Sequence, residues 1–162
     1  LVRAAPRIQT SVVIAGDGPE RQNCERLADE LGVRIHFPGE LPQQELVEHL
    51  HACAVFAFPS VARSEAFGIS VLEAHACGKP VVATRLGTGV EFANLDGETG
   101  LNVPPRDAEA FAEAVNHLLA HPDERQRMGE FARARILRDF RSETVARREY
   151  ELYEAALEQA SE

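Results

Sequence analysis

The fold class can be predicted from residues 53–84, CAVFAFPSVARSEAFGISVLEAHACGKPVVAT. Residues 53–58 are almost wholly apolar, as expected for a strand that is buried on both faces. Residues 69–77 are predicted to form a helix that ends at Gly78 and Pro80, and residues 80–83 a second, short strand. A strand, a helix and another strand in this order predict a parallel βαβ unit with a right-handed crossover.

The alternation of strand-length and helix-length segments continues on both sides of this unit. Upstream, we expect strands at residues 11–15 and 33–37 and helices at residues 20–31 and 43–51. Downstream, we expect a strand at residues 100–103 and helices at residues 107–120, 123–138 and 142–159. The chain is therefore predicted to be one α/β domain, residues 1–162, with a doubly wound parallel sheet and extra C-terminal helices.

The first residues do not fit the start of such a domain. Residues 1–5 have the character of the end of a helix that leads into the strand at residues 11–15. A doubly wound domain rarely opens on the end of a helix, because a preceding strand is needed to complete the sheet. We therefore expect that the first strand of this domain is absent and that the chain is part of a longer protein.

Composition and charge argue against several classes of protein. The chain has 26 acidic and 17 basic residues and a net charge of -9, whereas a nucleic-acid-binding protein needs a basic surface. No apolar run approaches the ~18 residues of a membrane span, and residues 1–10 lack the pattern of a signal peptide. The three cysteines are far apart and imply no disulfide framework. These features predict a reduced, cytoplasmic protein, and the eight arginines within residues 125–148 are expected on a solvated helical tail.

The candidate site lies in the loop at residues 59–68, which follows a predicted strand. Ligands of parallel sheets bind at the carboxyl ends of the strands, and a helix start offers free amides and a positive dipole to phosphate. The amides of Phe67, Gly68 and Ile69 could therefore hold a diphosphate, and Gly68 lets the backbone approach it closely. Glu65 precedes these amides, and Glu73 follows roughly 8 Å along the helix at a rise of ~1.5 Å per residue.

Two carboxylates on either side of a phosphate site suggest a ligand with hydroxyl groups at both ends. A carboxylate can accept two hydrogen bonds from a vicinal diol. A nucleotide-sugar has this layout, with a ribose, a diphosphate and a sugar in line. The spacing alone favours the alternative, because most glutamates eight positions apart are solvated surface charges. Glu73 favours the functional interpretation because it lies in an otherwise small, apolar helix.

Residues 64–84 read SEAFGISVLEAHACGKPVVAT. This segment resembles the signature of the retaining GT-B glycosyltransferases of glycosyltransferase group 1 (family 4). The signature is a Glu, then seven residues that include Phe-Gly, then a second Glu. The resemblance extends to residues 13–20, VIAGDGPE, to residues 96–105, DGETGLNVPP, and to residues 127–129, RMG. It implies a Rossmann-like, carboxyl-terminal half of a GT-B fold, the half that binds the nucleotide-sugar donor.

The resemblance also implies a role for each site residue. Glu73 would bind the ribose hydroxyls, and Glu65 would position the donor sugar and act as the catalytic residue that supports an oxocarbenium-like transition state. The amides of residues 67–69 would hold the sugar and the diphosphate, the loop at Leu41 would lie against the base, and Gly16 and Thr88 would complete the donor contacts. Transfer would retain the anomeric configuration without a metal or a cofactor.

The resemblance implies partners as well. The acceptor, a glycan or lipid, would bind a missing N-terminal domain, in the synthesis of surface polysaccharide or glycolipid. The parent protein could attach peripherally to the inner face of the membrane, and no nucleic acid is expected as a partner.

The sequence departs from the family pattern at three places. Ala66 stands where a glycine is usual, and residues 87–91, GTGVE, replace the usual Gly-Gly-x-Pro-Glu. The Arg and Lys that clamp the diphosphate in the family are absent, and Lys79 is not placed to replace them. Each lost charge-assisted hydrogen bond is worth roughly 1.5–3 kcal/mol. We therefore expect the isolated chain to bind nucleotide weakly and to catalyse nothing.

Other functions fit the same residues less well. A nicotinamide dinucleotide site is rejected because Arg21 stands at the third glycine of the Gly-x-Gly-x-x-Gly pattern. The six histidines show no zinc spacing with further ligands and are expected to be solvated or in the core, while Cys53 and Cys77 are expected to be small core residues. A GT-B epimerase or hydrolase of nucleotide-sugars and a non-catalytic binding module remain as alternatives.

Overall fold

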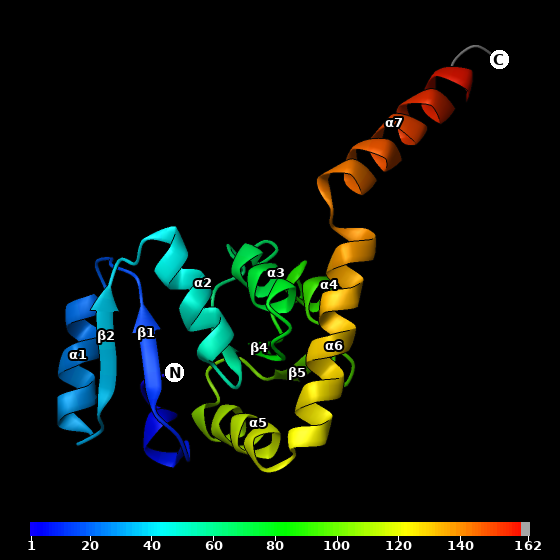
Figure 1. Cartoon of the computed structure of the whole chain (residues 1–162). Helices are drawn as coiled ribbons and strands as arrows, with labels where there is room; N and C mark the ends of the chain where they lie inside the picture. The colour runs from blue at the N-terminus through cyan, green and yellow to red at the C-terminus, as the bar shows by residue number, and fades with distance from the viewer. Residues whose placement is uncertain (160–162) are drawn as a thin grey trace.

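The structure is a computed structural model that describes residues 1–159, and it is an α/β fold with only parallel strand pairs (Figure 1). The strands are β1 (Val12–Ala15), β2 (Ile35–Gly39), β3 (Phe56–Phe58), β4 (Val81–Thr84) and β5 (Gly100–Val103). They form two sheets, β1-β2 and β3-β4-β5, where the sequence predicted one. Every expected strand is present, so the predicted α/β class is confirmed.

Helices separate the strands as the alternating pattern predicts. They are α1 (Arg21–Glu30), α2 (Gln43–Ala52), α3 (Ile69–Ala76), α4 (Val90–Ala93), α5 (Ala108–Ala120), α6 (Pro122–Asp139) and α7 (Ser142–Gln159). The single turn of α4 was not predicted. None of the helices within residues 1–159 is long and apolar enough to span a bilayer.

The prediction for the first residues was wrong in its detail. Residues 2–4 form a turn rather than the end of an α-helix, and a 3-10 helix, η1 (Ala5–Arg7), follows. Pro6 lies within η1, where its missing N–H removes no interior helical hydrogen bond. The side chain of Asn116 in α5 then holds this segment, since it donates to the Arg7 carbonyl at 2.7 Å and accepts from the Gln9 amide at 2.9 Å.

The strand predicted at residues 53–58 is shorter and less buried than expected. Only Phe56–Phe58 forms a strand, and within it only Phe58 is fully buried. Cys53 is half-buried and Ala54 is exposed, contrary to the expectation of a strand covered on both faces. The physical reason is that β3 pairs with β4 along one edge, while its other edge faces an open groove.

The core is built on both faces of β4, whose four residues are all buried. Val81 and Ala83 pack into one cluster with residues of α3 and α4. Val82 points to the opposite face and packs with residues of α5 and α6. Because alternate residues of a strand face opposite sides of the sheet, this division matches helices on both faces of the three-stranded sheet.

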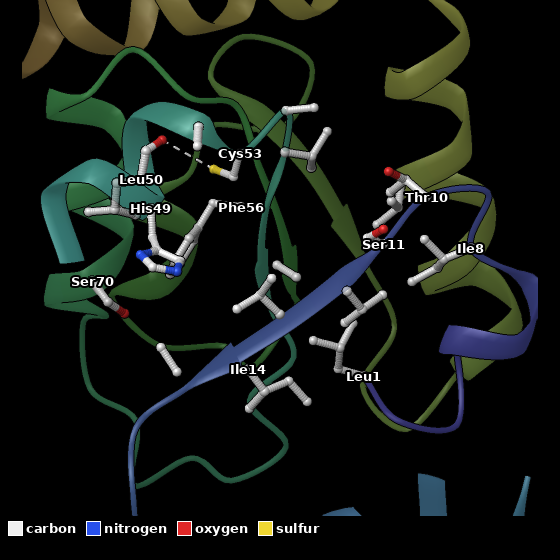
Figure 2. Close-up of a pocket in the computed structure, with 18 of the residues that line it drawn as sticks. Leu1, Ile8, Thr10, Ser11, Ile14, His49, Leu50, Cys53, Phe56 and Ser70 are labelled. Carbon is white, nitrogen blue, oxygen red and sulfur yellow. Dashed lines mark hydrogen bonds between the residues drawn. The ribbon is translucent and has the colours of Figure 1, made fainter. Parts of the chain in front are cut away.

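A groove of about 650 Å3 separates the two sheets. One wall is β1, the other includes Phe56 and Ala57 of β3, and α2, α3 and α5 contribute further residues. Figure 2 shows β1 crossing in front of these side chains, with Leu50 and Phe56 on one side and Ile8 and Leu1 on the other. Within residues 1–159, β1 and β3 therefore each present an edge without a partner strand to the same space.

Candidate donor-binding site

The loop between β3 and α3 brings Glu65 to the start of α3. Gly68 is the N-cap residue, with φ of 82° and ψ of 67°, a left-handed conformation that favours glycine. A Glu65 carboxylate oxygen, Oε1, accepts a hydrogen bond from the Gly68 amide at 3.1 Å. The carboxylate predicted to flank the helix start thus lies at that helix start and stabilises its positive end.

Two of the three amides expected to hold a diphosphate remain free. Among the described residues, the amides of Phe67, Ile69 and the next residue, Ser70, make no hydrogen bond. The Gly68 amide is already used by Glu65. The start of α3 therefore keeps the unpaired donors that favour an anion, and a ligand that needs the Gly68 amide would have to move the Glu65 carboxylate.

Glu73 lies on a different side of the site from Glu65. It is exposed on α3 and lines the groove between the two sheets together with Ser70 and Ala15. This side of α3 faces the open groove instead of the core, so the carboxylate of an otherwise apolar helix is not buried. Its carboxylate is accessible to a ligand that reaches from the start of α3 into the groove.

The loop after β4 packs directly on the loop that carries Glu65. The Gly89 amide donates to the Ala66 carbonyl at 2.8 Å. Glu91 accepts hydrogen bonds from the amides of Gly87 at 2.8 Å and Thr88 at 3.2 Å. Burial opposes ionisation of Glu91, but these amide hydrogen bonds outweigh it and lower the pKa of the carboxyl. Thr88 therefore lies beside the site, with its amide engaged within its own loop.

Gly16 and Leu41 belong to the other sheet. Gly16 follows β1 and donates its amide to the Gly39 carbonyl at 2.7 Å, which joins the carboxyl ends of β1 and β2. Leu41, two residues after β2, is half-buried. The residue before Gly16, Ala15, lines the same groove as Glu73. The predicted residues therefore form two groups, one around the start of α3 and one across the groove.

An aromatic cluster behind the site was missed by sequence reasoning. The ring of Phe67 lies 6.1 Å from that of Phe92 and 6.2 Å from that of Phe140, measured between centroids. The guanidinium of Arg135 lies 5.0 Å from the centroids of both Phe92 and Phe140 and donates to the carbonyls of Phe92 at 2.7 Å and Ala93 at 2.9 Å. Arg135 thereby holds α4 against Phe67, the residue before Gly68.

Arg135 also corrects the expectation that the arginines of residues 125–148 are all solvated. Its exposed fraction is 5%, and it lies on α6 beside a packed stripe that includes Met128 and Ala132. The spacing of these three residues, four and then three, is helical and places Arg135 on the buried face. That spacing was the signal in the sequence.

Basic side chains near the site are few. Lys79 donates to the backbone carbonyl of His51 at 2.7 Å, at the end of α2, which agrees with the expectation that it does not serve the start of α3. Arg63, which the sequence did not single out, is exposed on the loop before Glu65 and donates to the Gly87 carbonyl at 3.3 Å. It is the basic residue that shares the loop with Glu65.

The parallel strands, the helices on both faces and this loop–helix site define a Rossmann-like domain of the GT-B class. Sucrose-phosphate synthase from Thermosynechococcus elongatus matches it with a TM-score of 0.85 and 32% identity, over 98% of this chain and 41% of that protein. HepE from Anabaena, solved in complex with UDP, matches with a TM-score of 0.86 and 24% identity, over 96% and 44%. The second likeness concerns the fold alone.

The chain belongs to the glycosyl transferases group 1 family, whose model matches residues 1–135. D-rhamnosyltransferase WbpZ of Pseudomonas aeruginosa is 43% identical over 125 residues, 76% of this chain and 33% of that protein. O-antigen chain mannosyltransferase C of Escherichia coli is 35% identical over 162 residues, 99% of this chain and 44% of that protein. The chain thus spans less than half the length of these relatives, and the family resemblance of residues 64–84 is confirmed.

Proposed function

We propose that this chain is the donor-binding domain of a retaining glycosyltransferase, which transfers a sugar from a nucleotide-diphosphate sugar to an acceptor. The observation that carries this proposal is the start of α3, where free amides lie beside the Glu65 carboxylate and Glu73 lies further along the same helix. The names of the relatives, which include O-antigen and rhamnosyl transferases, support a role in the synthesis of surface polysaccharide or glycolipid.

In this proposal each end of the donor meets a carboxylate. The diphosphate rests on the amides at the start of α3, Glu73 accepts hydrogen bonds from the ribose hydroxyls, and Glu65 leaves the Gly68 amide to bind the sugar hydroxyls. Gly16, Leu41 and Thr88 make the remaining donor contacts. No metal and no cofactor other than the donor itself takes part.

Glu65 acts in the transfer step through its charge. As the bond from the anomeric carbon to the diphosphate breaks, positive charge develops on the sugar ring, and the Glu65 carboxylate, now hydrogen-bonded to the sugar, stabilises it. The free amides at the start of α3 favour the negative charge that builds on the leaving phosphate. Both groups are held by the same turn, residues 65–70.

The groove between the sheets supports the proposal that the domain is completed by a strand from a longer protein. β1 and β3 each have an unpaired edge facing the groove, and both strands belong to parallel sheets. One further parallel strand placed there would join the two sheets into one and cover the apolar side chains that now line the groove. An N-terminal domain of the parent would hold the acceptor glycan or lipid, and we propose a cytoplasmic parent that attaches peripherally to the inner face of the membrane.

Calorimetric titration with nucleoside diphosphates of different bases tests this proposal on the chain and on its full-length parent. The isolated chain should bind weakly and transfer no sugar, whereas the parent should bind one nucleotide tightly and form a glycoside with retained anomeric configuration in the presence of a chelator. In the parent, Glu73→Gln should weaken nucleotide binding roughly 10- to 100-fold, because hydrogen bonds to a charged acceptor are lost. Glu113→Gln, an exposed change on α5, is the matched control.

Each alternative function gives a different result in the same experiment. Unchanged nucleotide binding by Glu73→Gln would support a non-catalytic module and contradict the proposal. Release of free sugar, or an epimerised nucleotide-sugar, in place of a glycoside would identify a hydrolase or an epimerase. Tight nucleotide binding by the isolated chain would refute the prediction that the chain binds nucleotide weakly without the rest of the parent protein.

A further inference from the structure

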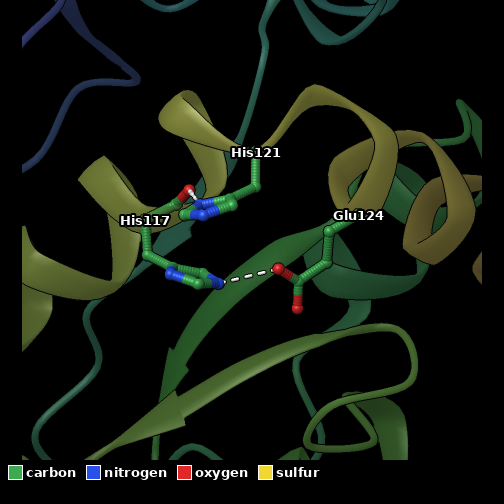
Figure 3. A group of neighbouring side chains, drawn as sticks. All are labelled: His117, His121 and Glu124. Carbon is green, nitrogen blue, oxygen red and sulfur yellow. Dashed lines mark hydrogen bonds and ion pairs between the residues drawn. The ribbon is translucent and has the colours of Figure 1, made fainter.

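Three side chains with metal-binding atoms meet at the corner between α5 and α6 (Figure 3). His117 lies in the last turn of α5, His121 lies between the helices, and Glu124 lies in the first turn of α6. One potential ligand atom from each lies within 4.8 Å of the other two, and within the described part of the chain no other group of three such residues does so. The sequence signal is His-x3-His-x2-Glu, which was not recognised because its residues fall on two helices.

Each imidazole of this corner is held by a hydrogen bond, that of His117 to the carboxylate and that of His121 to the backbone. His117 Nε2 lies 2.7 Å from Glu124 Oε2, and the two rings are stacked with centroids 4.2 Å apart. His121 Nδ1 lies 2.7 Å from the backbone carbonyl of His117, so this nitrogen carries the proton and donates it. The Nε2 of His121 then has a free lone pair, which is how a metal-binding histidine is commonly held.

The backbone of the corner is held in place independently of these three side chains. Arg125 Nη1 donates to the carbonyls of Leu118 at 3.0 Å and Leu119 at 3.1 Å, which are carbonyls at the end of α5. Leu118 is fully buried beneath the corner. The ligand set is therefore carried on a fixed backbone, so binding requires only side-chain adjustment.

We propose that His117, His121 and Glu124 bind a divalent transition-metal ion such as Zn2+, with water completing the coordination. Two imidazoles and a carboxylate are a common set of zinc ligands, with metal–ligand distances of about 2.0–2.2 Å. At such distances the ligand atoms of a tetrahedral site lie roughly 3.3 Å apart. On binding, the ion displaces the proton that His117 Nε2 donates to Glu124, and His117 coordinates as the tautomer with its proton on Nδ1. The 2.7 Å contact between His117 and Glu124 then opens slightly, and His121 closes toward them.

This site is separate from the proposed donor site. The residue before His117, Asn116, holds the segment that leads into β1, so the end of α5 lies at the amino ends of the strands. The start of α3 lies at the carboxyl end of β3. The ion would therefore fasten α5 to α6 and take no part in sugar transfer.

Titration of the 162-residue chain with ZnCl2 by calorimetry, and with Co2+ by visible absorption, tests the site. We expect one ion per chain and a four-coordinate Co2+ spectrum. His121→Ala and Glu124→Gln should each weaken binding by roughly tenfold or more. Glu124→Gln can keep a hydrogen bond to His117, so it removes the anionic ligand without opening the corner. His51→Ala, an exposed histidine on α2, is the matched control.

Thermal unfolding provides a second readout. Zn2+ should raise the melting temperature of the wild-type chain and of His51→Ala, because an ion that binds the folded chain stabilises it. At the same Zn2+ concentration it should raise the melting temperature of His121→Ala less than that of the wild-type chain. The proposal is overturned if the wild-type chain binds no ion, if His121→Ala keeps wild-type affinity, or if His51→Ala weakens binding as much as His121→Ala does.

Discussion

At the scale of single residues, Gly68 links the fold to the candidate site. Its left-handed φ of 82° turns the chain from the loop into α3 and leaves its amide facing Glu65. A Cβ at this position would lie 3.1 Å from Val71 Cγ2 and 3.2 Å from Phe58 Cζ. Conformation and packing therefore both require a glycine at the start of α3.

Gly68→Ala should destabilise the chain by roughly 2–5 kcal/mol, the sum of about 1–2 kcal/mol for a left-handed alanine and about 1–3 kcal/mol for overpacking. Gly32→Ala is the matched control, because Gly32 has φ of 65° and a Cβ added there would have no atom within 4 Å. Gly32→Ala should therefore lose only the about 1–2 kcal/mol of stability that a left-handed alanine costs. Urea unfolding measures both, and equal losses would show that packing against Phe58 and Val71 contributes nothing.

The sequence allowed the surroundings of some residues of the candidate site to be predicted but not those of others, for physical reasons. Glu65 and Gly68 were predictable because helix starts and left-handed turns depend on local sequence. The exposure of Glu73 was not predictable, because it depends on a groove formed by strands that are distant in sequence. The burial of Arg135 required knowing which carbonyls of α4 would face α6.

At the scale of elements, α6 packs unusually closely on the turn after α3. Gly129 of α6 lies against Gly78, and a Cβ on Gly129 would come within 2.1 Å of the Gly78 carbonyl oxygen. Its neighbour Met128 is fully buried, and Arg127 donates to the Gly97 carbonyl at 3.2 Å. The Arg-Met-Gly motif is thus a packing motif that seats α6 on the body of the domain.

Gly129→Ala tests this contact through the sign of its effect. In an unobstructed helix the change would stabilise the protein by about 1 kcal/mol. Here we expect a loss of more than about 2 kcal/mol, because the added methyl forces α6 away from Gly78. Urea unfolding should show a change within about 0.5 kcal/mol for the exposed neighbour Glu130→Ala. A Gly129→Ala chain more stable than wild type would contradict the close packing.

Element boundaries show where local patterns were sufficient. The bounds of α5 were predictable because Asp107 caps its start, with the carboxylate accepting from the Ala110 amide at 2.9 Å. The single turn of α4 was not predictable from local sequence, because Arg135 of α6 and packing against α3 stabilise it. The length of β3 was overestimated, since apolar composition says nothing about whether a partner strand lies alongside.

At the scale of the whole molecule, one titratable group is buried where several elements meet. His75 of α3 has an exposed fraction of 1%, and its Nδ1 donates to the Lys79 carbonyl at 3.1 Å. Burial lowers the pKa of His75 from 6.5 to about 4. The folded chain therefore keeps this imidazole neutral at a pH where the unfolded chain protonates it.

The free energy of unfolding should consequently fall as the pH is lowered from about 6.5 to about 4. In this range the unfolded state binds a proton that the folded state does not, and the loss from His75 amounts to about 3 kcal/mol at about 1.4 kcal/mol per pKa unit. Urea unfolding across this range should show a flatter pH dependence for His75→Gln. His36→Gln, an exposed change in β2, should keep the wild-type slope, and identical slopes for all three chains would exclude His75 as the cause.

The division into two sheets is the feature of the whole molecule that sequence patterns could not show. The alternation of strands and helices predicted every strand and the parallel direction, and both are confirmed, although β3 is shorter than predicted. Whether β1 and β3 pair with each other depends on the residues that pack between them, and the sequences of the two strands do not contain that information. The facing unpaired edges became visible only once the strands were placed in space.

The hydrogen bond from the Gly68 amide to Glu65 has a consequence for selectivity. The start of α3 already carries an anion of its own, the Glu65 carboxylate, so a free sulfate or inorganic phosphate that uses the Gly68 amide must displace this carboxylate and offers it no hydrogen bond in return. Under the proposed function, a nucleotide-sugar compensates the displaced carboxylate with a hydroxyl from its sugar ring. We expect this internal competitor to make the start of α3 discriminate against simple anions.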